Sequence, residues 1–479
     1  MKKRTCHQLA LLLLLFHFSG TGWGQVTASI TGVVRDASGA VVPGAAVTVQ
    51  HVETGATRSA QTDENGNFSV PSLPVGQYEI DVQKTAFKQQ VRSGITLAVG
   101  QQAVVNITLE VGDVEERVNV TAEAPLVNTT LSSTSGLVSE REVKELPLNG
   151  RSFDQLLTLN TGTANVSSNR NTNQPGNLFS VSGRRPEENR FLMNGVDYVS
   201  ASGGINAASP NGSNGQVLGV DAVREFNVVE YTYGAEWGKR AGAQISIVTT
   251  SGTNQVHGDV FEYLRNSVLD ARNFFDRPIG RRIPPFERNQ FGGALGGPLK
   301  RDKLFLFGNY EGFRQRLGIS SVSFVPDANA RLGLLPPAGD PLGTPVPVVG
   351  LKQGMLPYAR SFWPAPNGSV LGGGLATSFA NPIQKVREDF GLTRLDYNIS
   401  SKDSFSTNYL IQDGENDVPS PNPNFFRPLP LRTQLLSLQE THIFSPALIN
   451  TASAGFGRGH IRLGAFPAVP IPTELAFIP

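Results

Sequence analysis

The clearest pattern in the chain is an alternation of apolar and polar residues over positions 391–412. Every second residue from Thr393 to Ile399 is apolar or a threonine, and the same holds from Phe405 to Ile411. Successive side chains of a strand point to opposite faces, so this pattern predicts a hairpin with one apolar and one polar face, joined by a short turn at 400–403. Weaker alternation predicts further strands at 256–265, 290–297, 303–313, 432–444 and 447–457.

The first 24 residues have the pattern of an export signal. Lys2, Lys3 and Arg4 precede an apolar run at 9–16, and small residues follow at 22–24. The run is too short to span a bilayer as a helix, so we expect cleavage before Gln25 rather than a membrane anchor. Cys6 is the only cysteine and precedes the apolar run. The exported chain therefore has no cysteine for a disulfide or for thiol catalysis.

Net charge and the motifs that are missing exclude several classes of function. The formal charge is +1, and it becomes −2 without the three cations of the export signal. A chain with this balance lacks the basic field of a nucleic-acid binder, so we expect no nucleic-acid partner. We find no zinc-protease, nucleophile-elbow or P-loop motif, so we expect neither an enzyme, nor a cofactor, nor a metal site. No later segment has the length and hydropathy of a transmembrane helix, which leaves a β-barrel as the way to enter a membrane.

Residues 25–111 carry short strands separated by turns. We expect strands at 30–36, 41–49, 73–82 and 104–109, and Asn65-Gly66 predicts a tight hairpin at 62–68. The pattern resembles the carboxypeptidase regulatory-like domain, a transthyretin-like β-sandwich grouped with carbohydrate-binding folds. The resemblance implies a non-catalytic module; His51 is its only histidine, so it holds no zinc dyad. Sugar binding and a spacer or docking role are both open.

Residues 112–250 contain linked motifs that resemble the plug domain of TonB-dependent outer-membrane transporters. The strings are VSGRRP at 181–186, FLMNGVD at 191–197, VREFNV at 223–228, YGAEWG at 233–238 and GAQISIVT at 242–249. The resemblance implies an α+β plug inside a gated pore, powered by the TonB-ExbB-ExbD complex. The plug-motif residues that it marks are Arg184, Arg185, Arg190, Asn194, Gly195, Asp197, Gly234, Gly238 and Gly242.

Two features of the plug motifs lead to specific expectations. The three arginines either pair with carboxylates of the barrel wall or contact substrate, and we favour the structural role because buried charges need partners. The family commonly has Asp-Gly where this chain has Asn194-Gly195. Both pairs form turns, so we expect this departure to change little.

The candidate TonB-coupling segment is Glu116, Arg117, Val118, Asn119 and Val120, because it resembles the extended start of these transporters. The backbone of an extended segment can pair with the edge of a sheet in TonB, and a mechanical force can then be transmitted through this pairing. A first plug strand without a coupling role is the alternative. Ser139 and Glu142 predict a capped helix at 139–146. The Asn/Ser/Gly-rich stretches 165–177 and 200–215 predict mobile loops that face the extracellular side.

Residues 251–479 read as the beginning of an outer-membrane barrel, with about seven strands and a Pro/Gly-rich extracellular loop between 314 and 383. The strings LPLNGRSF at 146–153 and NQFGGALGGPL at 289–299 resemble the Oar-like branch of the family. Members close with twenty-two strands or more, so we expect this chain to be the N-terminal part of a longer transporter.

The predicted fold class is mainly β: export signal, small sandwich, α+β plug and the first strands of an incomplete antiparallel barrel. The resemblance places the chain in the cell outer membrane, in contact with its lipid, with the N-terminal domain in the periplasm. It implies TonB-dependent transport of a bulky substrate such as an oligosaccharide, peptide or metal chelate. The alternative is a surface-binding or adhesion protein that uses the N-terminal domain to bind carbohydrate. The sequence does not decide between import and export.

Overall fold

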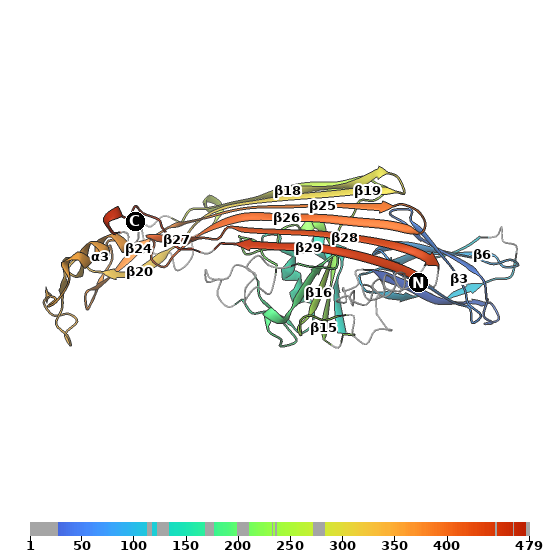
Figure 1. The fold of residues 1–479 in the computed structure, drawn as a ribbon, viewed down its shortest axis with the longest axis horizontal. Helices are drawn as coiled ribbons and strands as arrows, with labels where there is room; N and C mark the ends of the chain where they lie inside the picture. Colours follow the sequence, from blue (N-terminus) through green and yellow to red (C-terminus); the bar gives the residue numbers. More distant parts are fainter. Residues whose placement is uncertain are drawn as a thin grey trace, which may run out of the picture.

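The computed structural model describes residues 27–112, 117–121, 134–167, 177–198, 210–231, 233–234, 237–271, 283–445, 448–462 and 464–475. The export signal and Glu116 lie outside these ranges. Long antiparallel strands run along the molecule, with a small β-domain at one end and a module that contains α3 (Leu356–Phe362) at the other (Figure 1). The plug lies against one face of the long strands. The predicted mainly-β class is confirmed.

The N-terminal domain is a sandwich of two sheets. One sheet has the order β4-β1-β7, with β8 also paired to β1, and the other has the order β3-β2-β5-β6-β9. Inward positions alternate along β1 and β2, which places Ile30, Val34, Val47 and Val49 in a fully buried core. The strands are β1 (Ala28–Asp36), β2 (Ala46–His51), β3 (Thr57–Gln61), β4 (Asn67–Leu73), β5 (Gly76–Gln83), β6 (Gln89–Leu97), β7 (Gln102–Val104), β8 (Ile107–Leu109) and β9 (Arg117–Thr121).

The predicted hairpin at 62–68 is wrong in its pairing, although its turn forms. Asp63 accepts the backbone N–H groups of Asn65 and Asn67, and Gly66 has φ 72°. However, β3 pairs with β2 whereas β4 pairs with β1. The turn therefore connects the two sheets of the sandwich. Asn-Gly specifies the local bend, but which sheet the next strand joins is decided by burial of its apolar face.

The plug is built on a five-stranded sheet with the order β10-β15-β16-β13-β14. β16 is buried at every position because both of its neighbours and the barrel wall cover it. The predicted helix is present as α2, and its capping box is confirmed: Glu142 Oε2 accepts the Ser139 N–H at 2.8 Å. The elements are β10 (Thr134–Val138), α2 (Glu140–Glu145), η1 (Phe153–Leu159), β11 (Thr163–Asn165), β12 (Phe179–Val181), η2 (Pro186–Glu188), β13 (Arg190–Met193), β14 (Val196–Asp197), η3 (Val220–Ala222), β15 (Val223–Tyr231) and β16 (Gln244–Thr249).

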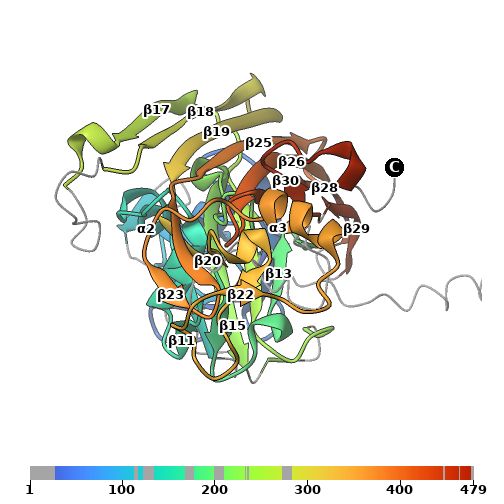
Figure 2. The same ribbon diagram turned by 90° about the vertical axis from the view of Figure 1, so that its left-hand side faces the viewer.

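In the described part of the chain the barrel wall consists of seven long strands, each antiparallel to the next. The predicted hairpin is confirmed, with Thr393 opposite Tyr409 and Leu395 opposite Thr407. Most strands extend beyond the ranges predicted from the sequence. They are β17 (His257–Asn266), β18 (Phe286–Lys300), β19 (Leu304–Gly318), β25 (Ile383–Asn398), β26 (Asp403–Pro419), β28 (Leu431–Ser445) and β29 (Leu448–Ile461). Among the described residues the wall is an open, curved sheet bounded by β17 and β29 (Figure 2).

Within the described ranges, no helix has the length and hydropathy needed to cross a bilayer.

The inner face of the wall is less polar than the alternation predicted. Asn408 and Gln412 face inward as expected, but so do Phe307, Phe390 and Leu410, which are buried in one core with the plug. A water-filled lumen favours polar residues, whereas a lumen that holds a plug must also pack against its apolar side chains. Packing against the plug therefore explains why apolar residues occur among the polar ones on the inner face of the wall.

The segment predicted as a long loop between 314 and 383 contains a folded module. Its sheet has the order β20-β24-β23, and a second pair and three helical segments lie beside it. The elements are β20 (Ser321–Pro326), η6 (Ala330–Leu332), β21 (Leu334–Leu335), β22 (Val346–Pro347), η7 (Gln353–Met355), α3, β23 (Val370–Gly372) and β24 (Leu375–Ala380). Proline and glycine here terminate short elements rather than prevent them.

Four short elements complete the described chain. The strands β27 (Phe425–Pro428) and β30 (Phe466–Pro467) pair with each other, and β27 also pairs with β26, so they extend the wall at the end that carries the module. The single turns η4 (Ser267–Leu269) and η8 (Thr473–Leu475) follow β17 and β30.

Candidate functional site

The turn between β13 and β14 fastens the plug to the barrel wall. Asn194 and Gly195 have φ 46° and 82°, as a two-residue hairpin turn requires. The Asn194 amide donates to Thr249 Oγ1 at 2.7 Å and to Asn408 Oδ1 of β26 at 2.8 Å. Ser437 of β28 donates to the Asn194 carbonyl at 3.1 Å. This turn therefore contacts two wall strands at once.

We predict that Asn194→Ala lowers the free energy of unfolding by about 2 kcal/mol, because it leaves buried polar partners unsatisfied and puts alanine at a positive φ. Asn194→Asp is expected to stay within about 1 kcal/mol of the wild type. The new carboxylate oxygen would face Asn408 Oδ1, but a 180° rotation of the Asn408 amide brings its Nδ2, which is buried without a hydrogen-bond partner, into position to donate to it. Thermal denaturation of both variants in detergent is the measurement. An equal loss in both would contradict this assignment.

Arg190 and Asp197 form an ion pair inside the plug. Arg190 Nε lies 2.7 Å from Asp197 Oδ1, and Lys239 also contacts that carboxylate. Burial raises the pKa of Asp197, but the two cations more than offset this effect and hold it below its usual value. Arg190 Nη1 also donates to the carbonyl of Gly238 at 3.3 Å. These motif residues thus join β13, β14 and the loop before β16.

The remaining motif residues lie elsewhere in the plug. Arg184 and Arg185 are exposed, on the segment between β12 and η2. Gly234 accepts the N–H of Trp237 at 3.2 Å. A Cβ on Gly242 would lie 2.6 Å from the Glu188 backbone, so this position requires glycine. The functional role given to the plug-motif residues stays a prediction.

Two fully buried carboxylates of the barrel wall bind the plug backbone. Glu311 of β19 accepts the N–H of Gly219 at 2.9 Å, and Glu388 of β25 accepts the N–H of Asn214 at 2.8 Å. Gly212 lies so close to Glu388 that an added Cβ would overlap the carboxylate. The predicted mobility of 200–215 is therefore wrong for its described part, 210–215, which is packed against the wall. Most of the other predicted loop, 165–177, lies outside the described residues.

Among the described plug residues, Arg151 is an arginine that reaches a wall carboxylate. Its guanidinium contacts Asp221 at 2.6 Å and Glu311 at 3.7 Å, and it lies 3.8 Å from the centre of the Phe261 ring. The sequence predicted pairing with wall carboxylates for Arg184, Arg185 and Arg190 instead. The sequence feature that could have indicated Arg151 is the LPLNGRSF string, in which it directly follows a turn glycine.

The N-terminal domain is clamped to the plug through Glu53. Both carboxylate oxygens of Glu53 accept from Arg224 of β15, at 2.8 and 2.9 Å, and its carbonyl accepts the N–H of Asn254 at 2.9 Å. Burial raises the pKa of Glu53, but Arg224 more than offsets this and lowers it below the usual value. Asn254 in turn bonds to Asp302, in the turn between β18 and β19, at 2.7 Å. One residue of the first domain thus connects to plug and barrel.

Glu225 makes a second contact across the same interface. It accepts the Val99 N–H at 2.5 Å, while Asn227 donates to the Val99 carbonyl at 3.2 Å. Burial raises the pKa of Glu225 to about 7, against the opposing effects of the Val99 hydrogen bond and the Arg224 charge. This carboxyl is therefore protonated in the folded protein over a pH range where it is ionised in the unfolded chain.

We predict that docking of the N-terminal domain weakens as the pH rises from 5 to 8. The pKa of Glu225 is about 7 in the folded protein and 4.5 in the unfolded chain, so the folded state binds the proton more tightly. The resulting contribution to the free energy of unfolding is fully present below pH 4.5 and is lost as the pH rises through 7. The loss is on the order of 2 kcal/mol. Glu225→Gln keeps the acceptor without the charge, so its urea-unfolding midpoint should vary less between about pH 5.5 and 8. An unchanged pH dependence in this variant would contradict the prediction.

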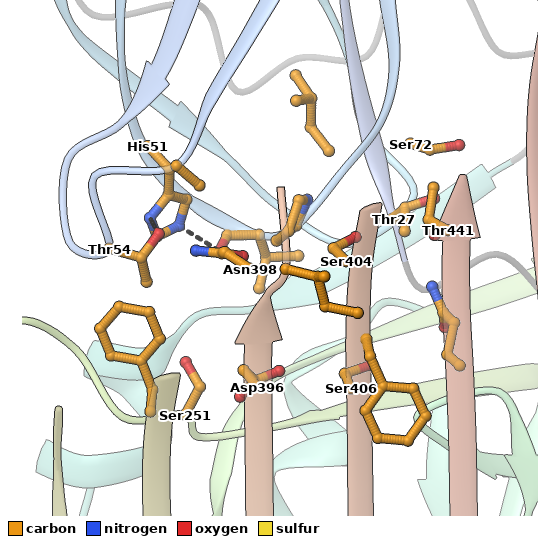
Figure 3. A pocket seen from close by; sticks show the side chains of 18 of the residues that line it. Thr27, His51, Thr54, Ser72, Ser251, Asp396, Asn398, Ser404, Ser406 and Thr441 are labelled. Carbon is orange, nitrogen blue, oxygen red and sulfur yellow. Dashed lines mark hydrogen bonds between the residues drawn. The ribbon is translucent and has the colours of Figure 1, made fainter. Parts of the chain in front are cut away.

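A cavity of about 370 Å³ lies where the three parts of the chain meet. His51 and Thr54 of the N-terminal domain stand on one side, and Asp396, Asn398 and Thr441 of the barrel stand on the other (Figure 3). Burial lowers the pKa of His51, so its imidazole is mainly neutral near pH 7. Polar side chains therefore stand on both sides of the cavity, and apolar side chains such as Val75 and Phe305 complete its lining.

The described part of the candidate coupling segment is β9. It runs parallel to β6, with Asn119 opposite Val91, as the last strand of its sheet among the described residues. The segment is therefore extended, as predicted, and belongs to the N-terminal domain sheet rather than to the plug sheet. Its role in coupling stays a prediction.

Comparisons with known proteins bear on this arrangement. A family model of an outer membrane beta barrel domain matches residues 248–473, and one of a carboxypeptidase regulatory-like domain matches residues 29–110. The TonB-dependent transporter Oar of Myxococcus xanthus is 28% identical over 261 residues, which cover 52% of this chain and 23% of that protein.

Solved structures similar to this chain include an outer membrane transporter and a siderophore receptor. The transporter YddB of Escherichia coli aligns with a TM-score of 0.44 and 12% identity over 67% of this chain and 38% of its own. The siderophore receptor PiuA of Acinetobacter baumannii aligns with a TM-score of 0.36 and 12% identity over 68% and 45%. The chain spans about a quarter of the curated relative and less than half of each of these structures.

Proposed function

We propose that this outer-membrane chain, a relative of the TonB-dependent transporter Oar, takes part in moving a bulky substrate through a plugged barrel with energy from TonB. The observation that carries the proposal is the plug itself, which is fastened to the inner wall by buried polar contacts. An anchor for a surface-binding domain would need no plug. We infer transport rather than catalysis, and carbohydrate binding by the N-terminal domain stays a prediction.

The plug is held to the wall by separate hydrogen bonds, which a mechanical force on the plug can break one after another. Asn194, Glu311 and Glu388 hold it through hydrogen bonds to turns and backbone N–H groups rather than through a continuous sheet with the wall. The cavity beside His51 lies at the end of the wall where the N-terminal domain docks. We infer that this end faces the periplasm and that the substrate passes through the cavity once the plug has moved.

Energy would reach the plug through β9. A strand at the end of a sheet offers backbone groups to a partner strand, and we infer that the periplasmic partner is TonB. Arg117 to Val120 would supply this pairing, and Glu116 of the same segment lies outside the described residues. The Glu53–Arg224 ion pair connects the sandwich that carries β9 to the plug.

The test of the proposed function is TonB dependence in cells that contain the complete protein. Uptake of fluorescent oligosaccharide, peptide and metal-chelate probes is compared in cells with and without functional TonB. We expect at least one probe to enter only with TonB. Uptake of none of the three classes, or equal uptake without TonB, would argue against transport. Retained binding without uptake would favour the surface-binding alternative.

A second experiment addresses the coupling segment. The exported chain has no cysteine, so Val91→Cys with Asn119→Cys introduces a single pair at directly opposed positions of β6 and β9. If β9 must leave its sheet to reach TonB, oxidation stops uptake and a reductant restores it, while each single variant stays active. Uptake that is insensitive to oxidation, with the disulfide shown to form, would place coupling elsewhere or on the outer edge of β9.

A further inference from the structure

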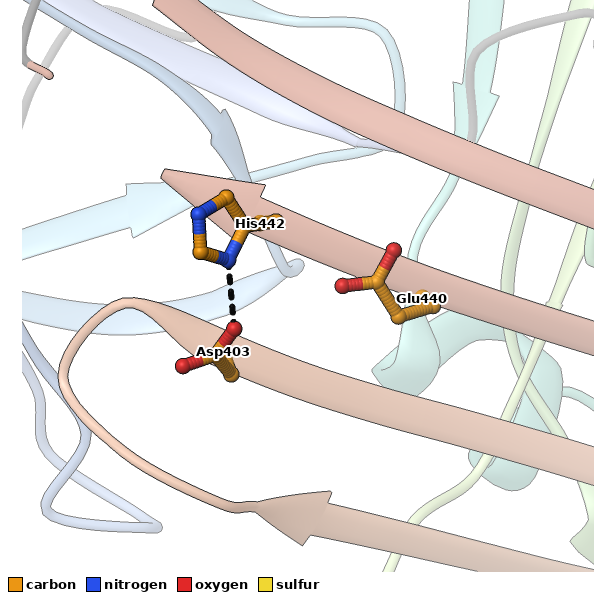
Figure 4. A group of neighbouring side chains, drawn as sticks. All are labelled: Asp403, Glu440 and His442. Atoms are coloured by element: carbon orange, nitrogen blue, oxygen red, sulfur yellow. Dashed lines mark hydrogen bonds and ion pairs between the residues drawn. The ribbon is translucent and has the colours of Figure 1, made fainter. Parts of the chain in front are cut away.

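Three metal-binding side chains meet on the outward face of the barrel wall, at the end where the N-terminal domain docks. Asp403 begins β26, and Glu440 and His442 lie near the end of β28. One ligand atom from each lies within 4.8 Å of the other two. Figure 4 shows the three side chains gathered from the two neighbouring strands.

The register explains why they share a face. Asp403 stands directly opposite His442, and Phe405 stands opposite Glu440. Gln439 and Thr441 line the cavity inside the wall, so the alternating Glu440 and His442 face outward. On the other side of β28, Asn450 of β29 stands opposite His442. Four residues with metal-binding atoms therefore lie on one face across three strands.

The side chains are oriented but not fully partnered. His442 Nδ1 lies 2.5 Å from Asp403 Oδ1, and the imidazole packs edge-on against Phe444 with ring centres 4.3 Å apart. The Glu440 side chain makes no hydrogen bond or ion pair with any described residue. Asp403 and His442 each keep 34% of their side-chain surface exposed, so an ion from solution can reach them.

We propose that Asp403, Glu440 and His442 bind a divalent transition-metal ion of the zinc class, with the Asn450 carboxamide oxygen or water as a further ligand. An imidazole with two carboxylates suits zinc better than calcium, which takes six or more oxygen ligands. Zinc ligands at about 2.0–2.2 Å from the ion lie about 3.4 Å from one another in a tetrahedron. Small side-chain rotations bring the present atoms to that spacing.

The ion would join two strands that no turn connects at this end. β26 and β28 are linked through β27, at the opposite end of the wall, so near Asp403 they are held by the strand hydrogen bonds and by the Asp403–His442 contact. A metal bound from both strands holds this edge of the wall together. It also neutralises the two carboxylates, of which only Asp403 has an ion-pairing partner among the described residues.

The experiment is a metal titration of the full chain, purified in detergent and stripped with a chelator. Isothermal titration with Zn²⁺ is expected to show one equivalent bound, and Co²⁺ should give visible absorption bands of a low-coordinate site. Glu440→Gln and His442→Gln should each weaken Zn²⁺ binding at least about tenfold. His460→Gln, an exposed histidine of β29 outside the cluster, is the matched control and should bind as the wild type does.

A second readout separates binding from folding. Zn²⁺ should raise the Tm of the wild type and of His460→Gln but not that of Glu440→Gln, whose side chain faces outward and is not needed for packing. The proposal is overturned if the wild type binds no zinc, if both cluster variants bind as tightly as the wild type, or if Ca²⁺ competes equally with Zn²⁺. None of these results depends on TonB or on transport.

Discussion

Replacement of Arg224 by methionine is expected to release the N-terminal domain from the plug. Arg224 is only 11% exposed and bonds to both oxygens of Glu53, so its loss leaves a largely buried carboxylate without its cation. Removal of one partner from a buried ion pair costs about 3 kcal/mol or more. Amide exchange should therefore rise at His51 to Gly55 and at Val99, measured by mass spectrometry on the intact chain.

A double-mutant cycle shows whether the ion pair itself is responsible. Glu53→Gln combined with Arg224→Met should cost less than the sum of the two single changes, because the double variant buries no unpaired charge. Arg141→Met is the control, since Arg141 pairs with Glu145 on the exposed surface of α2 and its loss should change stability far less than the loss of Arg224. Unchanged exchange at the interface in Arg224→Met would show that other contacts hold the domain.

Replacement of Glu388 by alanine is expected to loosen the plug on the other side, at residues 212–217. Glu388 is fully buried, accepts the Asn214 N–H and also binds the Gln412 amide. Alanine leaves both donors without a partner, at a cost of about 2–4 kcal/mol. Faster amide exchange at Asn214, together with a lower Tm, is the expected result. Glu388→Gln, which keeps one acceptor oxygen, should lie between the alanine variant and the wild type.

The matched control for this change is Glu415→Ala. Glu415 stands on β26 opposite Arg387, but it is exposed, and its side chain has no hydrogen bond or ion pair to the described plug residues. Its replacement should leave exchange at Asn214 unchanged. If Glu388→Ala behaves as Glu415→Ala does, the buried carboxylate does not hold the plug, and the anchoring role falls to Asn194 and Arg151.

Local features of this protein were readable from the sequence where short-range physics decides them. Alternation located the long wall strands, and the capping box located α2, because both depend on residues close together in the chain. The Asn65-Gly66 turn was also correct as a bend. Which strands it joins was not, since β3 and β4 belong to different sheets. Recognition of the sandwich and the barrel rested on the pattern of strands and turns together with motif resemblance.

The sequence by itself thus determined the strands, the capped helix and the order of the segments. Only the tertiary structure decided which polar residues meet: Glu53 with Arg224, 171 positions apart, and Glu388 with Asn214, 174 positions apart. Nothing in the neighbourhood of Glu388 distinguishes it from the exposed Glu415 until the plug lies against the wall. The physical reason is that burial, and hence the need for a partner, comes from the packing of distant segments. Strand periodicity fixes the direction of a side chain, but not what it will face.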